Sequence, residues 1–418
     1  MAEHAPQTGM LSGLRVLDLA DDRGIFTGRV LADLGADVVK VEPPGGDVAR
    51  GVAPFWKDAP GIENSLFWQL YAANKRSAVI DFATPTGRAL VERLAGQADI
   101  LVESFRPGFM ASIGLGYETL RSSNPRLIYV SVSPFGQDGP YAGMNATDLT
   151  GMALGGFMWL TGDADRPPLR VSIPHFWSLG SAAAAAGAMI AHQARAASGA
   201  GQWVDASCQQ AVARTLSHAP QFWDLNQVIL TRQGPYRPLG AGKRLRINYP
   251  CADGYVNFIQ PGGRSGGRNM AALVAWVNET NEGDPELDGV DFGGFGFGQI
   301  PDSLLAAMER TLELFFAPRT KRVLSEGAIA RRVLLFPVND AADLLTYPQL
   351  EARGFYRQVE GPDGEPMTTL GPWARASGAP LRVGRAPRLG EHTDEVLAEW
   401  CGLGLDEAGA LRAQGVVA

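Results

Sequence analysis

Residues 14–44 read LRVLDLADDRGIFTGRVLADLGADVVKVEPP, and this stretch decides the fold. Residues 14–20 are a short leucine and valine run typical of a buried strand. Residues 26–35 carry apolar side chains at helical spacing and end on a glycine, and residues 36–44 are a second apolar run that two prolines end. The stretch therefore predicts a β-α-β unit.

The same alternation continues through the next hundred residues. The apolar spacing predicts helices at 86–98 and 118–124 and strands at 99–105 and 125–133. An alanine-rich helix at 181–198 is then expected to pack tightly in a core. Strands that alternate with helices indicate a mostly parallel, doubly wound sheet, so the fold class is α/β with a Rossmann-like large domain.

A second domain is indicated by a change of composition. Between about residues 220 and 325 the chain becomes rich in Gly, Asn and Pro, with irregular segments at 233–258 and 278–302. We expect the large domain to comprise residues 1–220 and 331–418, and a smaller α+β domain to comprise residues 221–330.

Composition excludes several classes of function. Of the 418 residues, 45% are apolar and 19% charged, and 37 Lys and Arg against 44 Asp and Glu leave a net charge of −7, which argues against nucleic acid. The N-terminus lacks the pattern of a signal peptide, and the longest apolar run, 179–191, is too short to span a bilayer. The three cysteines lie far apart. We expect a cytoplasmic protein without a membrane partner.

Common cofactor motifs are absent or incomplete. The glycine run at 293–298 is not part of a β-α-β unit, and GAGKR at 240–244 lacks the first glycine and the hydroxyl residue of a P-loop. The five histidines form no HExxH pair, and no GxSxG elbow occurs. The sequence therefore favours neither a dinucleotide, a metal nor a serine nucleophile.

Cations beside predicted strands are candidates for anion binding. Lys75 and Arg76 stand just before the strand predicted within 74–82, and Arg106 ends another strand, where open α/β sheets bind ligands. The alternative interpretation is that these three side chains are ordinary solvated charges on the protein surface.

Ten segments together resemble the class III CoA-transferases, the CaiB/BaiF family. In chain order these segments are LSGLRVLDLA, LADLGADVVKVEPPGGDVAR, NKRSAVIDF, ESFRPG, GLGYETL, NPRLIYVSVSPFGQDGPYA, ATDLTGMALGG, GAGQWVDAS, DGYV and APRLGEHTDEVL. They run through almost the whole chain. The resemblance implies a Rossmann-like domain built from both chain ends, a smaller domain between them, and two interlocked subunits. It also implies that coenzyme A is handled as an acyl-CoA substrate.

The resemblance also implies binding residues. Those expected to contact CoA are Arg50, Asn74, Lys75, Arg76, Phe105 and Arg106. The segment PGGRSGG at 261–267 is similar to the family's glycine-rich loop, whose backbone N–H groups would stabilise an oxyanion; its glycines are Gly262, Gly263, Gly266 and Gly267. A simple turn is an equally good interpretation of that segment.

The chain departs from the family at the nucleophile. In the family mechanism an aspartate attacks the acyl-CoA thioester to give a mixed anhydride, the CoA thiolate then forms an enzyme thioester, and the incoming acid collects CoA. Counting from ATDL at 146–149 places Trp177 at this position, and the neighbouring His175 and Ser178 do not restore the carboxylate. Related racemases would have histidine where this chain has Thr147, so proton abstraction is not favoured either.

Three hypotheses follow. In the first, the chain is the non-catalytic subunit of a heteromeric CoA-transferase, similar to a subunit of the family's benzylsuccinate enzyme, and a homologous partner supplies the aspartate. CoA would then pass from a donor such as succinyl-CoA to a carboxylic acid such as benzylsuccinate. In the second, a homodimer uses another carboxylate, Asp148 or Asp205, although helix capping is the plainer role for Asp148. In the third, the chain binds acyl-CoA without catalysis.

Overall fold

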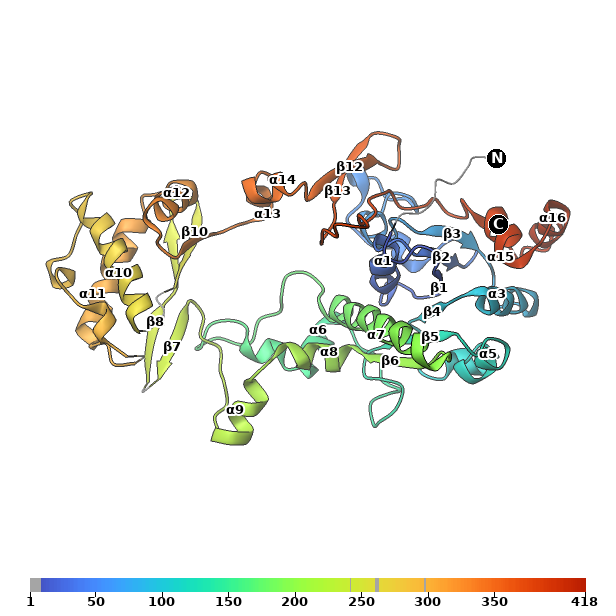
Figure 1. The fold of residues 1–418 in the computed structure, drawn as a ribbon, viewed down its shortest axis with the longest axis horizontal. Coiled ribbons are helices and arrows are strands. Elements are labelled where there is room, and N and C mark those ends of the chain that lie inside the picture. The colour runs from blue at the N-terminus through green and yellow to red at the C-terminus, as the bar shows by residue number, and fades with distance from the viewer. Residues whose placement is uncertain (1–8, 241, 260–262, 297) are drawn as a thin grey trace. The chain divides into compact units, whose positions relative to one another are not determined.

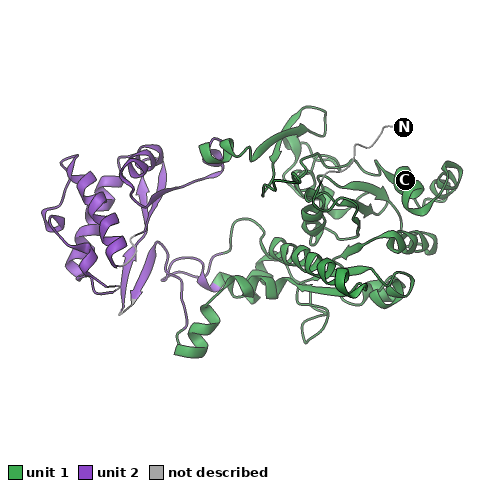
Figure 2. Cartoon of the chain, in the orientation of Figure 1, with its two compact units in different colours: residues 1–158, 170–228, 348–418 green, residues 159–169, 229–347 purple. Residues whose placement is uncertain are grey.

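The computed structural model describes residues 9–240, 242–259, 263–296 and 298–418. The chain divides into two compact units, which Figure 2 shows in separate colours. Unit 1 comprises residues 1–158, 170–228 and 348–418, and unit 2 comprises residues 159–169 and 229–347. The borders between the units fall at 228/229 and 347/348, whereas the sequence predicts 220/221 and 330/331, and residues 159–169 also belong to unit 2.

Unit 1 is built on a six-stranded parallel sheet in the order β3-β2-β1-β4-β5-β6 (Figure 1). The strands are β1 (Arg15–Asp18), β2 (Asp37–Glu42), β3 (Arg76–Val79), β4 (Ile100–Glu103), β5 (Ile128–Ser133) and β6 (Trp203–Ser207). The strand order reverses between β1 and β4, which is the doubly wound arrangement. The predicted α/β fold class is confirmed.

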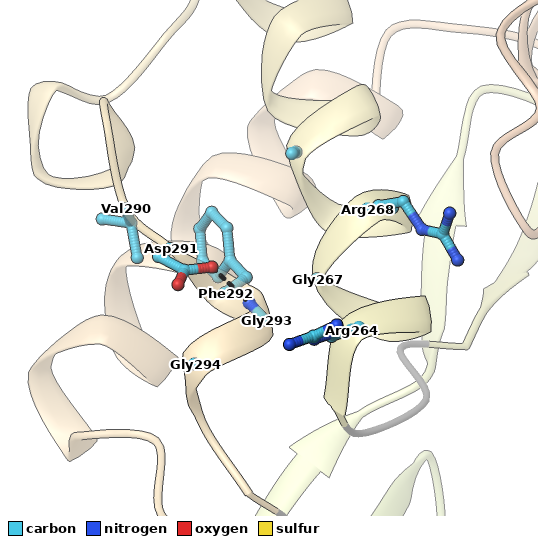
Figure 3. Close-up of a pocket in the computed structure, with 9 residues that line it drawn as sticks. Arg264, Gly267, Arg268, Val290, Asp291, Phe292, Gly293 and Gly294 are labelled. Atoms are coloured by element: carbon cyan, nitrogen blue, oxygen red, sulfur yellow. Dashed lines mark hydrogen bonds between the residues drawn. The ribbon is translucent and has the colours of Figure 1, made fainter.

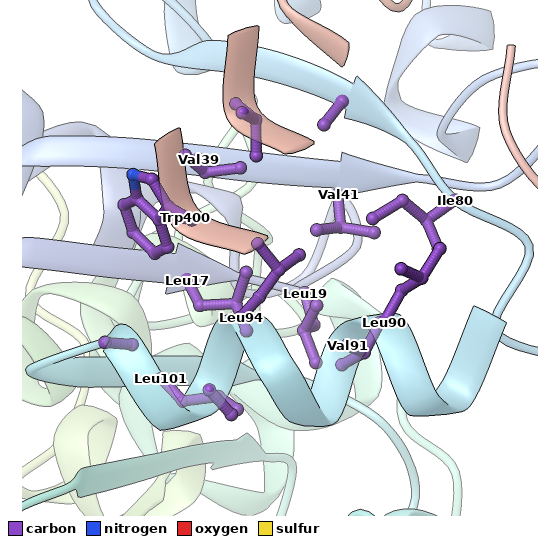
Figure 4. Close-up of a cluster of buried hydrophobic side chains, with 14 of the residues drawn as sticks. Leu17, Leu19, Val39, Val41, Ile80, Leu90, Val91, Leu94, Leu101 and Trp400 are labelled. Carbon is purple, nitrogen blue, oxygen red and sulfur yellow. The ribbon is translucent and has the colours of Figure 1, made fainter. Parts of the chain in front are cut away.

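Alternate residues of the strands face two separate cores. Leu17 and Val39 face the layer that contains α3 (Pro85–Gln97), α5 (Tyr117–Ser123) and α15 (Thr393–Cys401), as Figure 4 shows for much of this cluster. Val16 and Val38 face the opposite layer, formed by α1 (Ile25–Asp33) and α7 (Phe176–Ser198). Both faces of the sheet are therefore covered, as its continuous apolar strands require.

The alanine run forms helix α7, which packs one face tightly in a core. Ala184, Ala188 and Ala191 are buried against the sheet. Gly180 allows α8 (Cys208–Thr215) to approach closely, since a Cβ there would lie 2.1 Å from Cys208 Sγ. Small side chains thus set the spacing of this layer.

The remaining elements of unit 1 surround the sheet. They are the helices α2 (Leu66–Tyr71), α4 (Phe109–Ser112), α6 (Asp148–Leu154), α9 (Ala219–Asn226), α14 (Pro348–Ala352) and α16 (Leu405–Ala413), the 3-10 turns at Val48–Gly51, Trp56–Asp58 and Phe157–Leu160, and the hairpin β12 (Tyr356–Glu360) and β13 (Pro366–Leu370). The C-terminal segment returns to the sheet, where Val417 pairs with Ile80.

Unit 2 has its own core and an α+β architecture. Its elements are the hairpin β7 (Tyr236–Gly240) and β8 (Lys243–Arg246), the antiparallel sheet of β9 (Asn248–Cys251), β10 (Gly254–Phe258) and β11 (Leu335–Val338), the helices α10 (Gly263–Asn278), α11 (Asp302–Phe316), α12 (Lys321–Arg331) and α13 (Ala341–Leu345), and 3-10 turns at Pro285–Leu287 and Phe292–Gly294. Tyr249, Trp276 and Phe315 are buried among the helices. The expectation that 233–258 is irregular is wrong, because short antiparallel strands with prolines leave little periodicity in sequence.

Candidate functional site

The carboxyl ends of β1 and β4 form the first candidate site. An open parallel sheet binds ligands where its strand order reverses, and this reversal lies between β1 and β4. The chain places Asp21, Asp22 and Arg23 after β1, and Phe105 and Arg106 after β4. The polarity of these two turns decides which ligands this edge can accept.

The turn after β1 is acidic and internally bonded. Ser104 Oγ donates to Asp21 Oδ1 at 2.6 Å and accepts from the Asp21 backbone N–H at 2.9 Å. Arg23 Nε donates to Asp21 Oδ2 at 2.9 Å. Burial and the neighbouring Asp21 raise the pKa of Asp22. This turn therefore offers carboxylates where a dinucleotide site would offer a glycine-rich N–H loop.

The turn after β4 offers an aromatic ring and a cation. Phe105 is half-buried, and its ring centroid lies 6.0 Å from that of Phe82 and 5.0 Å from that of Phe109. Arg106 is exposed, and within the described residues its guanidinium has neither a hydrogen bond nor an ion pair. Arg106 is thus available to an external anion.

Glu103, at the end of β4, is a buried acid. It is 4% exposed, and its carboxylate accepts from the Phe105 backbone N–H at 2.8 Å. Burial raises the pKa of Glu103 to about 7. Near neutral pH this side chain is therefore partly protonated.

Lys75 and Arg50, both predicted CoA contacts, are held in internal ion pairs. Lys75 Nζ lies 2.7 Å from Asp18 Oδ2 and donates to the Ile25 carbonyl at 2.7 Å. Gly28 of α1 leaves room for this pair, because a Cβ there would lie 2.2 Å from Asp18 Oδ2. These contacts fix α1 against the sheet.

Arg50 is likewise held by residues of the chain itself. Its Nε lies 2.6 Å from Glu42, its Nη1 lies 2.8 Å from Glu63, and its guanidinium stacks 3.8 Å from the ring centroid of Trp68. The side chain is 1% exposed. In this structure Arg50 organises the segment after β2.

Asn74 and Arg76 lie at the start of β3. Asn74 has a φ of 66° and donates through Nδ2 to Asp33 Oδ1 at 2.6 Å. Arg76 pairs with Asp37 at 3.2 Å and with Glu399 at 2.8 Å. Together with Lys75 these two residues line a cavity of about 410 Å³, whereas Phe105 and Arg106 follow the end of β4. The predicted CoA contacts therefore do not form one cluster.

The predicted glycine-rich loop is a helix in the structure. Gly263, Gly266 and Gly267 belong to α10, and Gly262 lies outside the described residues. The expectation of a loop at Gly263, Gly266 and Gly267 is wrong. Gly267 is needed for close packing, since a Cβ there would lie 2.3 Å from the backbone nitrogen of Gly293.

Trp177 lies in the first turn of α7 and is half-buried. Its ring centroid lies 4.9 Å from that of Phe176, and the side chain packs against the core beneath α7. The carboxylate of Asp148 accepts from the backbone N–H groups of His175 at 2.7 Å and Phe176 at 2.8 Å. Asp148 therefore caps the start of α7. The sequence favours a capping role for this residue, but the helix that it caps is α7 and not α6, in which Asp148 itself lies.

The other candidate side chains near α7 are those of Asp205, His175 and Ser178. Asp205 accepts from the Gln137 backbone N–H at 2.8 Å, and burial raises the pKa of its carboxyl. His175 and Ser178 line a largely apolar cavity of about 670 Å³, which is also lined by Phe26 and Trp373. Sequence reasoning missed this cavity, because its walls come from segments more than three hundred residues apart.

Comparison with known proteins now identifies the family. The model of CoA-transferase family III matches residues 11–393. The chain belongs to CoA-transferase family III. The family's substrates are CoA thioesters, so CoA enters as part of the substrate. The predicted family resemblance is confirmed.

Two curated relatives and one solved structure align over nearly their full lengths. The chain is 37% identical over 416 residues to the BbsE subunit of succinyl-CoA:(R)-benzylsuccinate CoA-transferase from Thauera aromatica, covering 97% of this chain and 98% of that one. It is 34% identical to succinyl-CoA–D-citramalate CoA-transferase from Chloroflexus aurantiacus, covering 97% and 98%. A CaiB/BaiF family protein from Brucella suis superimposes with a TM-score of 0.80 at 29% identity, covering 94% of this chain and 100% of that chain.

The described residues contain neither a cluster of metal ligands nor a helix that could span a membrane. Among them, no three or more His, Cys, Asp or Glu side chains gather as a metal site would require. In the same part of the chain, every helix is too short or too polar to cross a bilayer.

Proposed function

We propose that this chain is the non-catalytic subunit of a heteromeric class III CoA-transferase. Its partner would be a homologous chain that retains an aspartate at the position occupied here by Trp177. The enzyme would transfer CoA from succinyl-CoA to a carboxylic acid, with benzylsuccinate as the first candidate. The BbsE relative, which is a subunit by name and acts on these two compounds, supports this choice.

The chemistry at the start of α7 carries the proposal. Family transfer needs a carboxylate that attacks a thioester, and an indole ring is not such a nucleophile. The one carboxylate that contacts this helix end among the described residues is Asp148, whose Oδ1 accepts from two backbone N–H groups. Nucleophilic attack by Asp148 would sacrifice both capping bonds. The fold of α7 is thus kept here without the catalytic group.

The chain's own contribution would be structure and substrate binding. Phe105 and Arg106 are the proposed CoA contacts, because they stand at the strand reversal and Arg106 has no internal partner in the described chain. Arg50 and Lys75 would act indirectly by fixing β1, β2 and α1 through buried ion pairs. Asn74 and Arg76 remain candidates at the start of β3.

Subunit composition is the first experiment. The chain is tagged in its source cell, purified under mild conditions and analysed by intact mass. We expect a second chain of similar size with aspartate at the position aligned to Trp177. The purified complex should transfer CoA from succinyl-CoA to benzylsuccinate, and this chain alone should not. Robust turnover by this chain alone would contradict the proposal.

The second experiment locates the covalent intermediate. The complex is incubated with succinyl-CoA, treated with hydroxylamine and digested for peptide mass spectrometry. Hydroxylamine converts an acyl thioester into a hydroxamate, so the modified carboxylate marks the nucleophile. We expect modification of the partner's aspartate. Modification of Asp148 or Asp205 in this chain would instead support a catalytic role here.

A further inference from the structure

Two glycine-rich segments meet in unit 2. Residues 263–267 form the first turns of α10, and the 3-10 turn Phe292–Gly294 lies against them (Figure 3). Gly267 and Gly293 permit this approach, because a Cβ on Gly267 would lie 2.3 Å from Gly293 N. The result is a recess of about 700 Å³.

Two arginines of α10 line the recess. Arg264 and Arg268 are one helical turn apart and exposed. Figure 3 shows Arg264 extending toward Gly293, whereas the guanidinium of Arg268 points away from Asp291 in this view. Neither guanidinium has a hydrogen bond or ion pair with any described residue. Arg264 is thus the nearer donor, and Arg268 adds charge from one turn away.

The acid of the recess does not neutralise these arginines. Asp291 Oδ1 accepts from the Gly293 backbone N–H at 3.0 Å and caps the 3-10 turn. No ion pair joins Asp291 to Arg264 or Arg268 in the described structure. The lining residues therefore carry two positive charges and one negative charge.

The position of Arg264 is not explained by helix stability. The first turn of a helix favours Asp or Glu because backbone N–H groups make that end positive. Helix α10 has no acidic residue in its first turn and has Arg264 there instead. An anion bound beside Arg264 would pair with this side chain and also interact favourably with the helix end.

We propose that this recess of unit 2 binds an oxyanion, with Arg264 as the principal contact and Arg268 as the secondary one. The bound group is a phosphate or a carboxylate, since both match the planar guanidinium in two-bond geometry. Unit 2 provides the recess by itself, so the site does not depend on which subunit carries the nucleophile.

The test is calorimetric titration of the full chain, in the assembly it forms, with inorganic phosphate and separately with succinate. We expect at least one probe to bind, and the stronger probe identifies the group. The Arg264→Gln variant should weaken binding about tenfold or more, because a charge-assisted hydrogen bond is lost, and Arg268→Gln should weaken it less. The control Arg322→Gln removes an exposed arginine of α12 and should leave binding unchanged.

A second readout does not depend on affinity. Phenylglyoxal modifies accessible arginines, and peptide mass spectrometry reports each rate. The binding probe should slow modification of Arg264 and leave Arg322 unaffected. Absence of binding by both probes, equal affinity of wild type and Arg264→Gln, or equal modification rates with and without probe would each overturn the proposal.

Discussion

The segments NKR at 74–76 of unit 1 and GRSGGR at 263–268 of unit 2 each carry two cationic side chains, yet Lys75 of the first and Arg264 of the second have different surroundings in the structure. Lys75 is fully buried against Asp18, 57 residues earlier in the chain. Arg264 is exposed and has no partner among the described residues. A cationic side chain near a glycine or at the start of a strand is therefore a candidate for ligand binding only when the structure shows that no residue of the chain already pairs with it.

The largest expected effect concerns Lys75, the buried cation of the two. Lys75→Met should destabilise unit 1 by about 3–5 kcal/mol, because it leaves the Asp18 carboxylate buried without its partner. Arg264→Met should leave the free energy of unfolding nearly unchanged. Urea denaturation of both variants measures the difference. Equal stability losses would show that the two cations are not distinguished as the structure indicates.

The next effect concerns a buried acid without a cationic partner. The raised pKa of Glu103, about 7 against a usual 4.5, means that the folded state holds its proton more tightly than the unfolded state. Stability should therefore fall as pH rises from 4.5 through 7, by about 3 kcal/mol from this group. Glu103→Gln should remove that loss in urea titrations between pH 4 and 8.

A control separates this effect from general surface charge. Glu92 is exposed on α3, so Glu92→Gln should retain the pH dependence of the wild type. If Glu103→Gln and wild type lose stability in parallel as pH rises, burial of the Glu103 carboxyl is not the cause.

The next prediction concerns the close contact between Gly267 and Gly293 in unit 2. Gly267→Ala should destabilise unit 2 by about 1–3 kcal/mol, because the new methyl group would overlap the backbone of Gly293. Gly96→Ala is the matched helical control, since a Cβ at Gly96 meets no atom within 4 Å. The control should be stabilising by about 0.5–1 kcal/mol. Thermal unfolding of both variants gives the comparison, and a neutral Gly267→Ala would contradict the close packing.

The smallest effect concerns Asp148. Asp148→Ala removes the acceptor for two backbone N–H groups at the start of α7 and should cost about 1 kcal/mol in urea denaturation. The reconstituted complex should still form the hydroxylamine-sensitive intermediate. Loss of that intermediate with unchanged stability would instead identify Asp148 as a reacting group.

Local patterns were sufficient for the parallel sheet and the family. The β-α-β unit at 14–44, the strand at 125–133 and the alanine helix all form where the apolar spacing predicted them, because each pattern is read within one element. The motifs also identified the family without structural information. The hairpins of 236–258 were missed, since antiparallel pairing depends on residues brought together across turns.

By itself, the sequence determined the α/β class and the family. Only the tertiary structure decided which charged groups are internally paired: Lys75 and Arg50 are buried in ion pairs, whereas Arg106 and Arg264 are free among the described residues. The structure also shows that Gly263, Gly266 and Gly267, predicted to lie in a loop, belong to helix α10. The physical reason is that the spacing of apolar residues determines structure within a single helix or strand. Ion pairs and close packing at a glycine depend instead on distances between segments that are remote in sequence.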